Sequence, residues 1–312
     1  MSGLQLMLPP FVACMVLVAM LSYLGLHVIA REVIFVDLSL AQMAALGSLC
    51  ALLFHISEDS AAPYVFALGA TALGAFVFAL TRTTGRGRVP QEAFIGIVYV
   101  MASAAAILVA NQVPGGGEAI EKTLVGSILW VTWPTIVKVA IAYAVLGIIH
   151  FGLRKRFLTI SFHPEEAERA GWRIRWWDFL FYLLFGVVIT LAVPIAGVLM
   201  VFSFLVVPAV IAFLFTTDKR TLAVIAWVTG AMASSLGLWL SYSRDLPTGP
   251  VIVCMYGILL VAAIFLRRFV PARSPDAAHL RARSERPDGT ASSPASGLPH
   301  QDTVASKRSA QA

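Results

Sequence analysis

Charged residues are scarce in this sequence, and their scarcity decides the class of protein. Only 13% of the 312 residues are charged, whereas 59% are hydrophobic and the mean hydropathy is +0.83. Soluble domains carry about a quarter charged residues. The composition therefore excludes a soluble protein and predicts one that crosses a membrane several times.

Two sequence patterns that would indicate a metal or disulfide site and a nucleotide-binding site are also missing. The three cysteines, Cys14, Cys50 and Cys254, lie in apolar runs and form no CxxC pair, which argues against a disulfide framework or a zinc knuckle. None of the five lysines follows a glycine, so the chain has no phosphate loop of the GxxxxGK type. We expect a protein that is not an enzyme, and any ATP that drives it must be hydrolysed by another chain.

What the chain does contain is a series of apolar runs, each close to the roughly 20 residues that cross a bilayer as a helix. They predict an all-α polytopic membrane protein with about nine transmembrane helices, within a range of eight to ten. The uncharged stretch 179–217 is too long for one span, and we place a break at Pro194–Gly197 because proline removes a helix donor and glycine permits a turn. A kinked, partly re-entrant helix pair is the alternative there. The predicted spans are 10–30, 33–55, 63–81, 92–111, 134–153, 177–193, 197–216, 221–241 and 250–267.

Lysine and arginine gather in alternate loops. With the N-terminus outside, the inner loops hold fifteen of these residues and the outer loops hold two. Basic residues favour the cytoplasmic side of a membrane, so we predict an outer N-terminus and a cytoplasmic C-terminus. Topology thus accounts for the net charge of +6, and no binding of nucleic acid is expected.

The last part of the chain differs in composition from the rest. Residues 271–312 are rich in Ala, Ser, Pro and Arg and show no apolar periodicity, so they cannot bury a core. We therefore expect a transmembrane domain over residues 1–270 and a disordered cytoplasmic tail over residues 271–312.

One apolar run carries polar side chains that need a reason. The stretch 31–47 places Asp37, Ser39 and Gln42 inside a predicted span. A charged side chain in hydrocarbon costs a few kcal/mol or more, so by default it faces a bundle interior, a water-filled path or a partner group. On a helix, small residues such as Ala44 and Ser48 follow on the face of Asp37 and leave room for a path. We therefore take Asp37, Ser39 and Gln42 as candidates to line a transport path.

Structural roles for the same residues remain open. Asp37 could pair with Arg31 at the membrane interface, and Gln42 could hydrogen-bond to a neighbouring helix. Glu92 opens a predicted span on the inner side, where we expect it to cap the interface near Arg88.

The longest inner loop, 154–176, predicts a helix of its own. Pro164 starts the run PEEAERAG, with acidic residues in its first turn, Arg169 near its end and Gly171 as a stop. We predict a short cytoplasmic helix here. It either lies on the lipid headgroups or docks a cytoplasmic partner, because this is the only predicted inner loop long enough to project from the membrane.

Four stretches together resemble a known family. They are REVIFVDLSLAQMAALG at 31–47, EAFIGI at 92–97, SFHPEEAERAG at 161–171 followed by GVLMVFSFLVVPAVIAFL at 197–214, and DLPTGP at 245–250. In this order and spacing the sequence resembles the permease subunits of bacterial ABC importers for zinc, manganese and iron, the ABC-3 family.

This resemblance implies a mechanism and a set of partners. It implies a type II ABC importer-like permease in the bacterial inner membrane, present as a dimer and surrounded by membrane lipid. It also implies cytoplasmic ABC ATPase subunits that use ATP to drive alternating access, and an extracytoplasmic protein that delivers the divalent metal. The segment around 161–171 would then be the coupling helix in the ATPase groove, with His163, Pro164, Glu165, Glu166 and Arg169 as its contacts.

The sequence departs from the family at the metal site. The family has Asp and His four residues apart, whereas here Gln42 and Leu38 fill those positions and Asp37 lies one residue upstream. Five residues place Asp37 and Gln42 about 140° apart around a regular helix, so as candidate metal ligands they share an ion only across a kink or π-bulge. No histidine falls near the middle of a predicted span, which favours oxygen ligands and hence manganese or iron(II) over zinc. The alternatives are a metal chelate or other small solute as cargo, or an unrelated secondary transporter.

Overall fold

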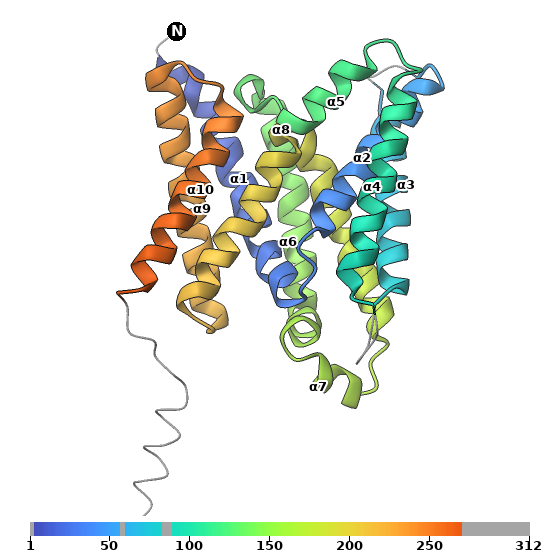
Figure 1. Cartoon of the computed structure of the whole chain (residues 1–312), viewed down its shortest axis with the longest axis vertical. Helices are drawn as coiled ribbons and strands as arrows, with labels where there is room; N and C mark the ends of the chain where they lie inside the picture. The colour runs from blue at the N-terminus through green and yellow to red at the C-terminus, as the bar shows by residue number, and fades with distance from the viewer. Residues whose placement is uncertain (1–2, 57–59, 83–88, 270–312) are drawn as a thin grey trace, which may run out of the picture. The chain divides into compact units, whose positions relative to one another are not determined.

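The computed structural model describes residues 3–56, 60–82 and 89–269, and within these ranges the chain is helical and contains no strand (Figure 1). The predicted tail 271–312 lies outside the described residues. Eight of the helices are long and apolar enough to cross a membrane. The helices are α1 Gly3–Ala30, α2 Val36–Leu53, α3 Ala62–Leu80, α4 Gln91–Ala110, α5 Gly116–Val125, the 3-10 turn Ile128–Trp130, α6 Trp133–Phe162, α7 Pro164–Arg169, α8 Ile174–Phe215, α9 Lys219–Arg244 and α10 Thr248–Arg267.

The long helix α8 is two helices joined at a sharp break. Gly197 has φ 73° and ψ 160°, a conformation outside any helix, and the two halves of α8 run in different directions from it (Figure 1). Counting the halves separately gives nine membrane-length segments, so both the predicted number of spans and the predicted break at 194–197 are confirmed. The break falls there because Pro194 supplies no backbone donor and glycine alone tolerates this backbone conformation.

A helix that the sequence patterns did not predict packs on this break. The segment after α5 donates two hydrogen bonds to carbonyls that precede the break: Ser127 N–H to Ile195 O at 3.0 Å and Ser127 Oγ to Pro194 O at 3.3 Å. Gly126 meets Gly197 backbone to backbone, since a Cβ on either residue would lie within 2.4 Å of the other segment. Backbone groups within a bilayer need such partners, so α5 stabilises the break in α8.

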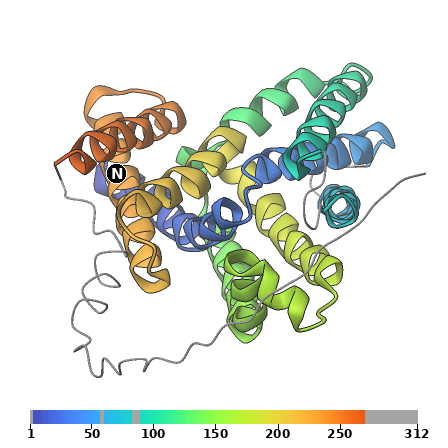
Figure 2. The ribbon, with the colours of Figure 1, turned by 60° about the horizontal axis from the view of Figure 1, so that its bottom comes forward.

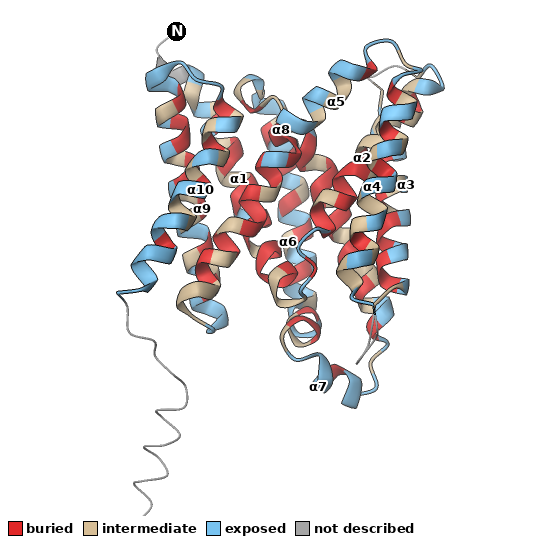
Figure 3. Ribbon diagram, viewed as in Figure 1, coloured by how far each residue is buried: buried red, intermediate tan, exposed pale blue. Residues whose placement is uncertain are grey.

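The core of residues 3–269 is built around α8. Its side chains Phe181, Phe185 and Phe204 are fully buried against α1, α3 and α10. Figure 3 shows buried residues along α1, α2 and α8, whereas few residues of α4 and α10 are buried. Exposed apolar residues on the outer helices are expected where the surrounding solvent is lipid.

The predicted loop helix is present as α7, between the end of α6 and the start of α8. Figure 2 brings this end of the bundle forward and shows α7 beside those two helix ends. The helix α6 is longer than its predicted span, 134–153, because it continues through the basic residues to Phe162. The short helix is thus carried on a stem that extends beyond the predicted membrane span.

Candidate translocation site and coupling region

The polar residues of α2 are buried without partners. Asp37 is 1% exposed and Ser39 is fully buried, and neither carboxylate oxygen of Asp37 nor the hydroxyl of Ser39 has a hydrogen-bond partner among the described residues. Burying a polar group costs free energy unless it is hydrogen-bonded or paired. The oxygen atoms of both side chains are therefore buried with unmet hydrogen-bonding capacity, and on a regular helix the two side chains point to nearly opposite sides of α2.

Glu92 of α4 closes the N-terminal end of α2. Its Oε1 atom accepts a hydrogen bond from the Phe35 backbone N–H at 2.9 Å, and its Oε2 atom has no partner among the described residues. Asp37 lies in the first turn of the same helix, where the helix dipole favours negative charge. The predicted partner of Glu92, Arg88, falls outside the described residues. Two carboxylates thus flank the start of α2, a juxtaposition that sequence spacing did not predict.

Gln42 does not join Asp37 on one face of the helix. It is 8% exposed, and α2 is an α-helix from Val36 to Leu53 with no bulge or kink that would realign the two side chains. The described residues contain no group of three or more His, Cys, Asp or Glu side chains that could hold a metal ion. Within the described part of one chain, the candidate ligands Asp37 and Gln42 therefore do not converge.

Arg31 pairs with Asp178, so the alternative in which it pairs with Asp37 is wrong. Arg31 Nη1 lies 2.6 Å from Asp178 Oδ1, and Arg82 Nη1 lies 2.5 Å from Asp178 Oδ2. The side chains of Arg31 and Asp178 are 2% and 0% exposed, and that of Arg82 is 12% exposed. One carboxylate between two guanidinium groups ties the end of α1 to the start of α8 and the segment after α3.

Two buried histidines are held by local contacts. His27 Nδ1 is 2.9 Å from Ser161 Oγ, an atom that also accepts a hydrogen bond from Arg31 Nε at 2.8 Å. His150 Nδ1 lies 3.0 Å from the carbonyl oxygen of Leu146 in its own helix. Both rings belong to an aromatic cluster around Phe181, so they support the helix packing at this end of the bundle.

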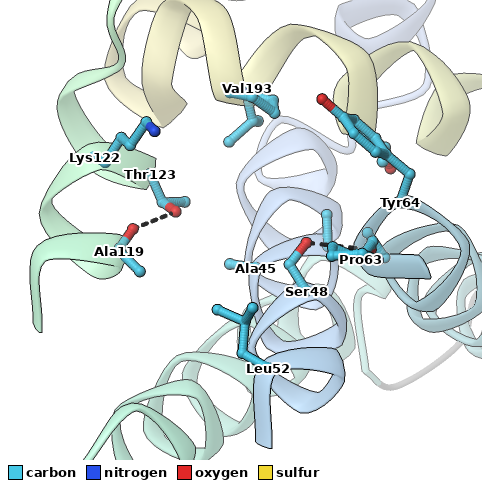
Figure 4. Close-up of a pocket in the computed structure, with 13 residues that line it drawn as sticks. Ala45, Ser48, Leu52, Pro63, Tyr64, Ala119, Lys122, Thr123 and Val193 are labelled. Carbon is cyan, nitrogen blue, oxygen red and sulfur yellow. Dashed lines mark hydrogen bonds between the residues drawn. The ribbon is translucent and has the colours of Figure 1, made fainter. Parts of the chain in front are cut away.

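A cavity of about 200 Å³ lies beside α5 (Figure 4). Figure 1 shows α5 at the end of the bundle opposite to α7. Ala44 and Ser48, on the helix face that begins with Asp37, contribute to its wall together with residues of α3, α5 and α8. Lys122 is its charged lining residue, and Tyr64 and Thr123 add hydroxyl groups. Figure 4 shows Ser48 and Thr123 hydrogen-bonded to carbonyl oxygens of Pro63 and Ala119. The cavity is open, lightly polar and lined by no carboxylate of the described residues.

The candidate coupling residues lie around a small buried hydrophobic cluster that attaches α7 to the neighbouring helices. Ala167, in the middle of α7, is fully buried against Ile160 and Ile174, which belong to α6 and α8. Glu165 and Arg169 point into solvent and form an exposed pair at 3.7 Å. The remaining candidates, His163, Pro164 and Glu166, are exposed, and His163 Nε2 lies 3.4 Å from Lys219 Nζ. The helix α7 therefore presents a polar surface to solvent, while its buried side is held by α6 and α8.

A family model settles where this arrangement belongs. The model of the ABC 3 transport family matches residues 3–267, which is nearly all of the described chain. The chain belongs to the ABC 3 transport family. The resemblance of the four sequence stretches is thereby confirmed, as is the interpretation of the chain as an ABC transporter permease.

Two relatives of this chain are described as transport system membrane proteins. A probable iron transport system membrane protein of Haemophilus influenzae is 28% identical over 226 residues, 70% of this chain and 79% of that protein. A manganese transport system membrane protein of Synechocystis is 28% identical over 199 residues, 62% of this chain and 65% of that protein.

Solved structures share the ABC 3 fold at lower identity. PsaBC from Streptococcus pneumoniae, solved in complex with Fab, matches with a TM-score of 0.70 at 18% identity and covers 90% of this chain and 98% of that one. A putative metal-chelate type ABC transporter in an inward-facing conformation matches with a TM-score of 0.62 at 19% identity, over 83% and 85% of the two chains. These likenesses show the fold of a transporter permease.

Sequence reasoning missed Asp178 in this ABC 3 chain, although a signal was present. Asp178 directly precedes the longest uncharged stretch, at the inner end of a predicted span, and an isolated carboxylate in that position needs a partner. Two arginines, Arg31 and Arg82, lie at inner ends of other predicted spans and were available to pair with it. Both do so because of the way α1, α3 and α8 pack.

Proposed function

We propose that this chain is the membrane permease of an ABC importer for divalent metal ions, of the zinc, manganese and iron class. The importer moves its cargo by alternating access and takes its energy from separate ATPase subunits. Membership of the ABC 3 family supports the transport class, and the printed descriptions of the Haemophilus and Synechocystis relatives support iron and manganese as the kind of cargo.

The observation that carries the assignment of cargo is Asp37. A carboxylate that is 1% exposed and unpaired, in a predicted membrane span, is costly unless a cation visits it. Besides the two oxygens of Asp37, Ser39 adds a third unpaired oxygen on the same segment, and Glu92 a fourth at the helix start. Oxygen ligands without imidazole suit manganese and iron(II) better than zinc, and an incomplete coordination shell suits an ion that must also leave.

The partners follow from α7 and from the family. In the proposed assembly, cytoplasmic ATPase subunits receive the polar surface of α7, an extracytoplasmic protein delivers metal at the opposite end beside α5, and two permease chains form a dimer. This places the protein in the bacterial inner membrane with its N-terminus outside and its C-terminus in the cytoplasm, as the distribution of lysine and arginine predicts.

Uptake of radioactive manganese by cells that lack the chromosomal gene tests the proposal. We expect the wild-type chain to restore uptake, and Asp37→Asn to lower it by about tenfold or more, since loss of one charged ligand costs at least about 1.4 kcal/mol. Asp245→Asn is the matched control, because Asp245 is an exposed carboxylate in a left-handed turn that asparagine also adopts. Unchanged uptake in Asp37→Asn at equal expression contradicts the assignment.

A second cargo is favoured by the cavity in Figure 4. Its charged lining residue is Lys122, which repels a bare cation but attracts an anionic metal chelate. A Lys122→Gln variant separates the two cargoes. If uptake of free manganese is unchanged or improved while uptake of an anionic chelate falls, the chelate is the cargo that the cavity selects.

A further inference from the structure

We propose that Arg31 is the positioning residue that connects α7 to the Asp37 segment of α2. Its guanidinium group bonds to both helices that carry α7, and its backbone leads directly into α2. This inference rests on the proposed function, in which α7 receives the movement of the ATPase subunits and Asp37 contacts the cargo.

The guanidinium group of Arg31 contacts both segments that flank α7, the end of α6 and the start of α8, which we call the stems of α7. Its Nε atom donates to Ser161 Oγ at 2.8 Å, in the last turn of α6, and its Nη1 atom lies 2.6 Å from Asp178 Oδ1, near the start of α8. It also lies over the ring of Phe181 in α8, 3.9 Å from the ring centroid. Because Ala167 is buried between the same two stems, a displacement of α7 moves the groups that Arg31 binds.

The backbone of Arg31 is fixed to the start of α2 by a tight turn. Arg31 N–H donates to His27 O at 3.0 Å and Val33 N–H donates to Val28 O at 3.2 Å, while Glu32 adopts a positive φ of 58°. Val33 and Val36 are then fully buried in the core. With so few residues between Arg31 and Asp37, and both ends of the turn anchored, a shift of the Arg31 side chain passes to the first turn of α2.

Because Asp178 has two arginine partners, Arg31 can change its contacts without leaving the buried carboxylate of Asp178 unpaired. Asp178 is completely buried, and a carboxylate left there alone is strongly destabilising. Arg82 holds the other oxygen of Asp178 from a partly exposed position. Asp178 thus keeps one partner when Arg31 moves, and Arg82, which has no hydrogen bond to the α6 stem in the described structure, serves as a natural control.

The test compares Arg31→Gln, Arg31→Lys and Arg82→Gln in the complete transporter in proteoliposomes. It measures ATP hydrolysed per Mn²⁺ taken up, with manganese chloride presented on the purified binding protein. We expect ATP use per ion to rise about fivefold or more for both Arg31 variants, as for coupling energies of 1–3 kcal/mol, and to stay near wild type for Arg82→Gln. Lysine keeps the positive charge but lacks the planar guanidinium group that contacts Ser161 and Asp178 at the same time. Arg31→Lys therefore shows whether coupling needs both contacts or only the charge.

Each outcome decides between coupling and simple stabilisation. If Arg31→Lys is fully coupled, or if Arg82→Gln uncouples as much as Arg31→Gln, the role of Arg31 is structural and the inference is overturned. Should the Arg31 variants fail to assemble, Ser161→Ala keeps Arg31 and removes the hydroxyl that links it to α6, together with the contact of that hydroxyl to His27. It must raise ATP use per ion for the inference to stand. A wild-type complex without manganese-stimulated ATP hydrolysis overturns the proposed function itself, which is a different result from normal coupling in the variants.

Discussion

Replacing Gly197 by alanine is the sharpest test of how the fold is held at its centre. Gly197 breaks α8 at φ 73° and ψ 160°, a region of backbone conformation that is essentially restricted to glycine. An added Cβ would also lie 2.4 Å from the carbonyl carbon of Val125 and 2.5 Å from the nitrogen of Gly126. These neighbours are backbone atoms, so no side chain can rotate away to make room.

The two effects set the expected size of the change. Holding a residue other than glycine in this conformation costs about 1–3 kcal/mol, and forcing a methyl group into a packed site costs about 1–3 kcal/mol more. Together they are about 2–6 kcal/mol, a large part of the roughly 5–15 kcal/mol that stabilises a typical protein. In a chain of this size the apparent melting temperature should fall by roughly 4–20 °C.

The assay is thermal unfolding of the detergent-purified protein at one fixed scan rate, since unfolding of large proteins is often irreversible. Gly257→Ala is the control, because Gly257 is inside α10 and a Cβ there meets nothing within 4 Å. Alanine in a helix is favoured over glycine by about 1 kcal/mol, so this variant should match or exceed wild type. Equal melting temperatures for Gly197→Ala and wild type would refute the reasoning about the break.

Three further changes test other parts of the account. Asp178→Asn leaves two guanidinium groups without their buried partner and should cost about 3–5 kcal/mol, lowering the melting temperature far more than Asp245→Asn does; equal effects would contradict the buried network. Ala167→Asp places a carboxylate in the buried hydrophobic cluster under α7 and should weaken co-purification of the ATPase subunits by about tenfold or more. Full co-purification would exclude α7 as the site where those subunits bind. The hydrogen bonds from Thr221 lower the pKa of Asp218, which caps α9, below its ordinary value of 3.8. The cap therefore contributes stability at and above pH 3.8 and loses it as the pH falls further, so the melting temperatures of wild type and Asp218→Ala should differ at pH 7 and converge in acid.

The sequence predicted the architecture well because membrane helices are specified locally. Apolar length gives the spans, Pro194 and Gly197 give the break in α8, and the run from Pro164 gives α7. Local rules did not predict α5, whose ten residues are too few to span a bilayer and too polar to resemble a span. Its place is set by backbone contacts with α8, which only the assembled fold supplies.

The candidate site was predicted in part, for a related reason. A carboxylate in an apolar run identifies Asp37 as unusual whatever surrounds it. The partners of Arg31 and Glu92 depend instead on which helices become neighbours, since Asp178 is distant in sequence from Arg31 and Phe35 is distant from Glu92. The opening expectation about residues 31–47 therefore narrows to Asp37, while Ser39 and Gln42, about 60° apart around the helix, stay separate candidates on another face of α2.

The central claim is that Asp37 contacts a divalent cation during ATP-driven transport. The most direct measurement is ATP-dependent uptake of manganese into proteoliposomes that contain the reconstituted transporter, with wild-type permease, Asp37→Asn and Asp245→Asn compared at equal amounts of complex. The account predicts uptake by wild type and Asp245→Asn and a loss of about tenfold or more in Asp37→Asn. Wild-type uptake by Asp37→Asn would contradict it.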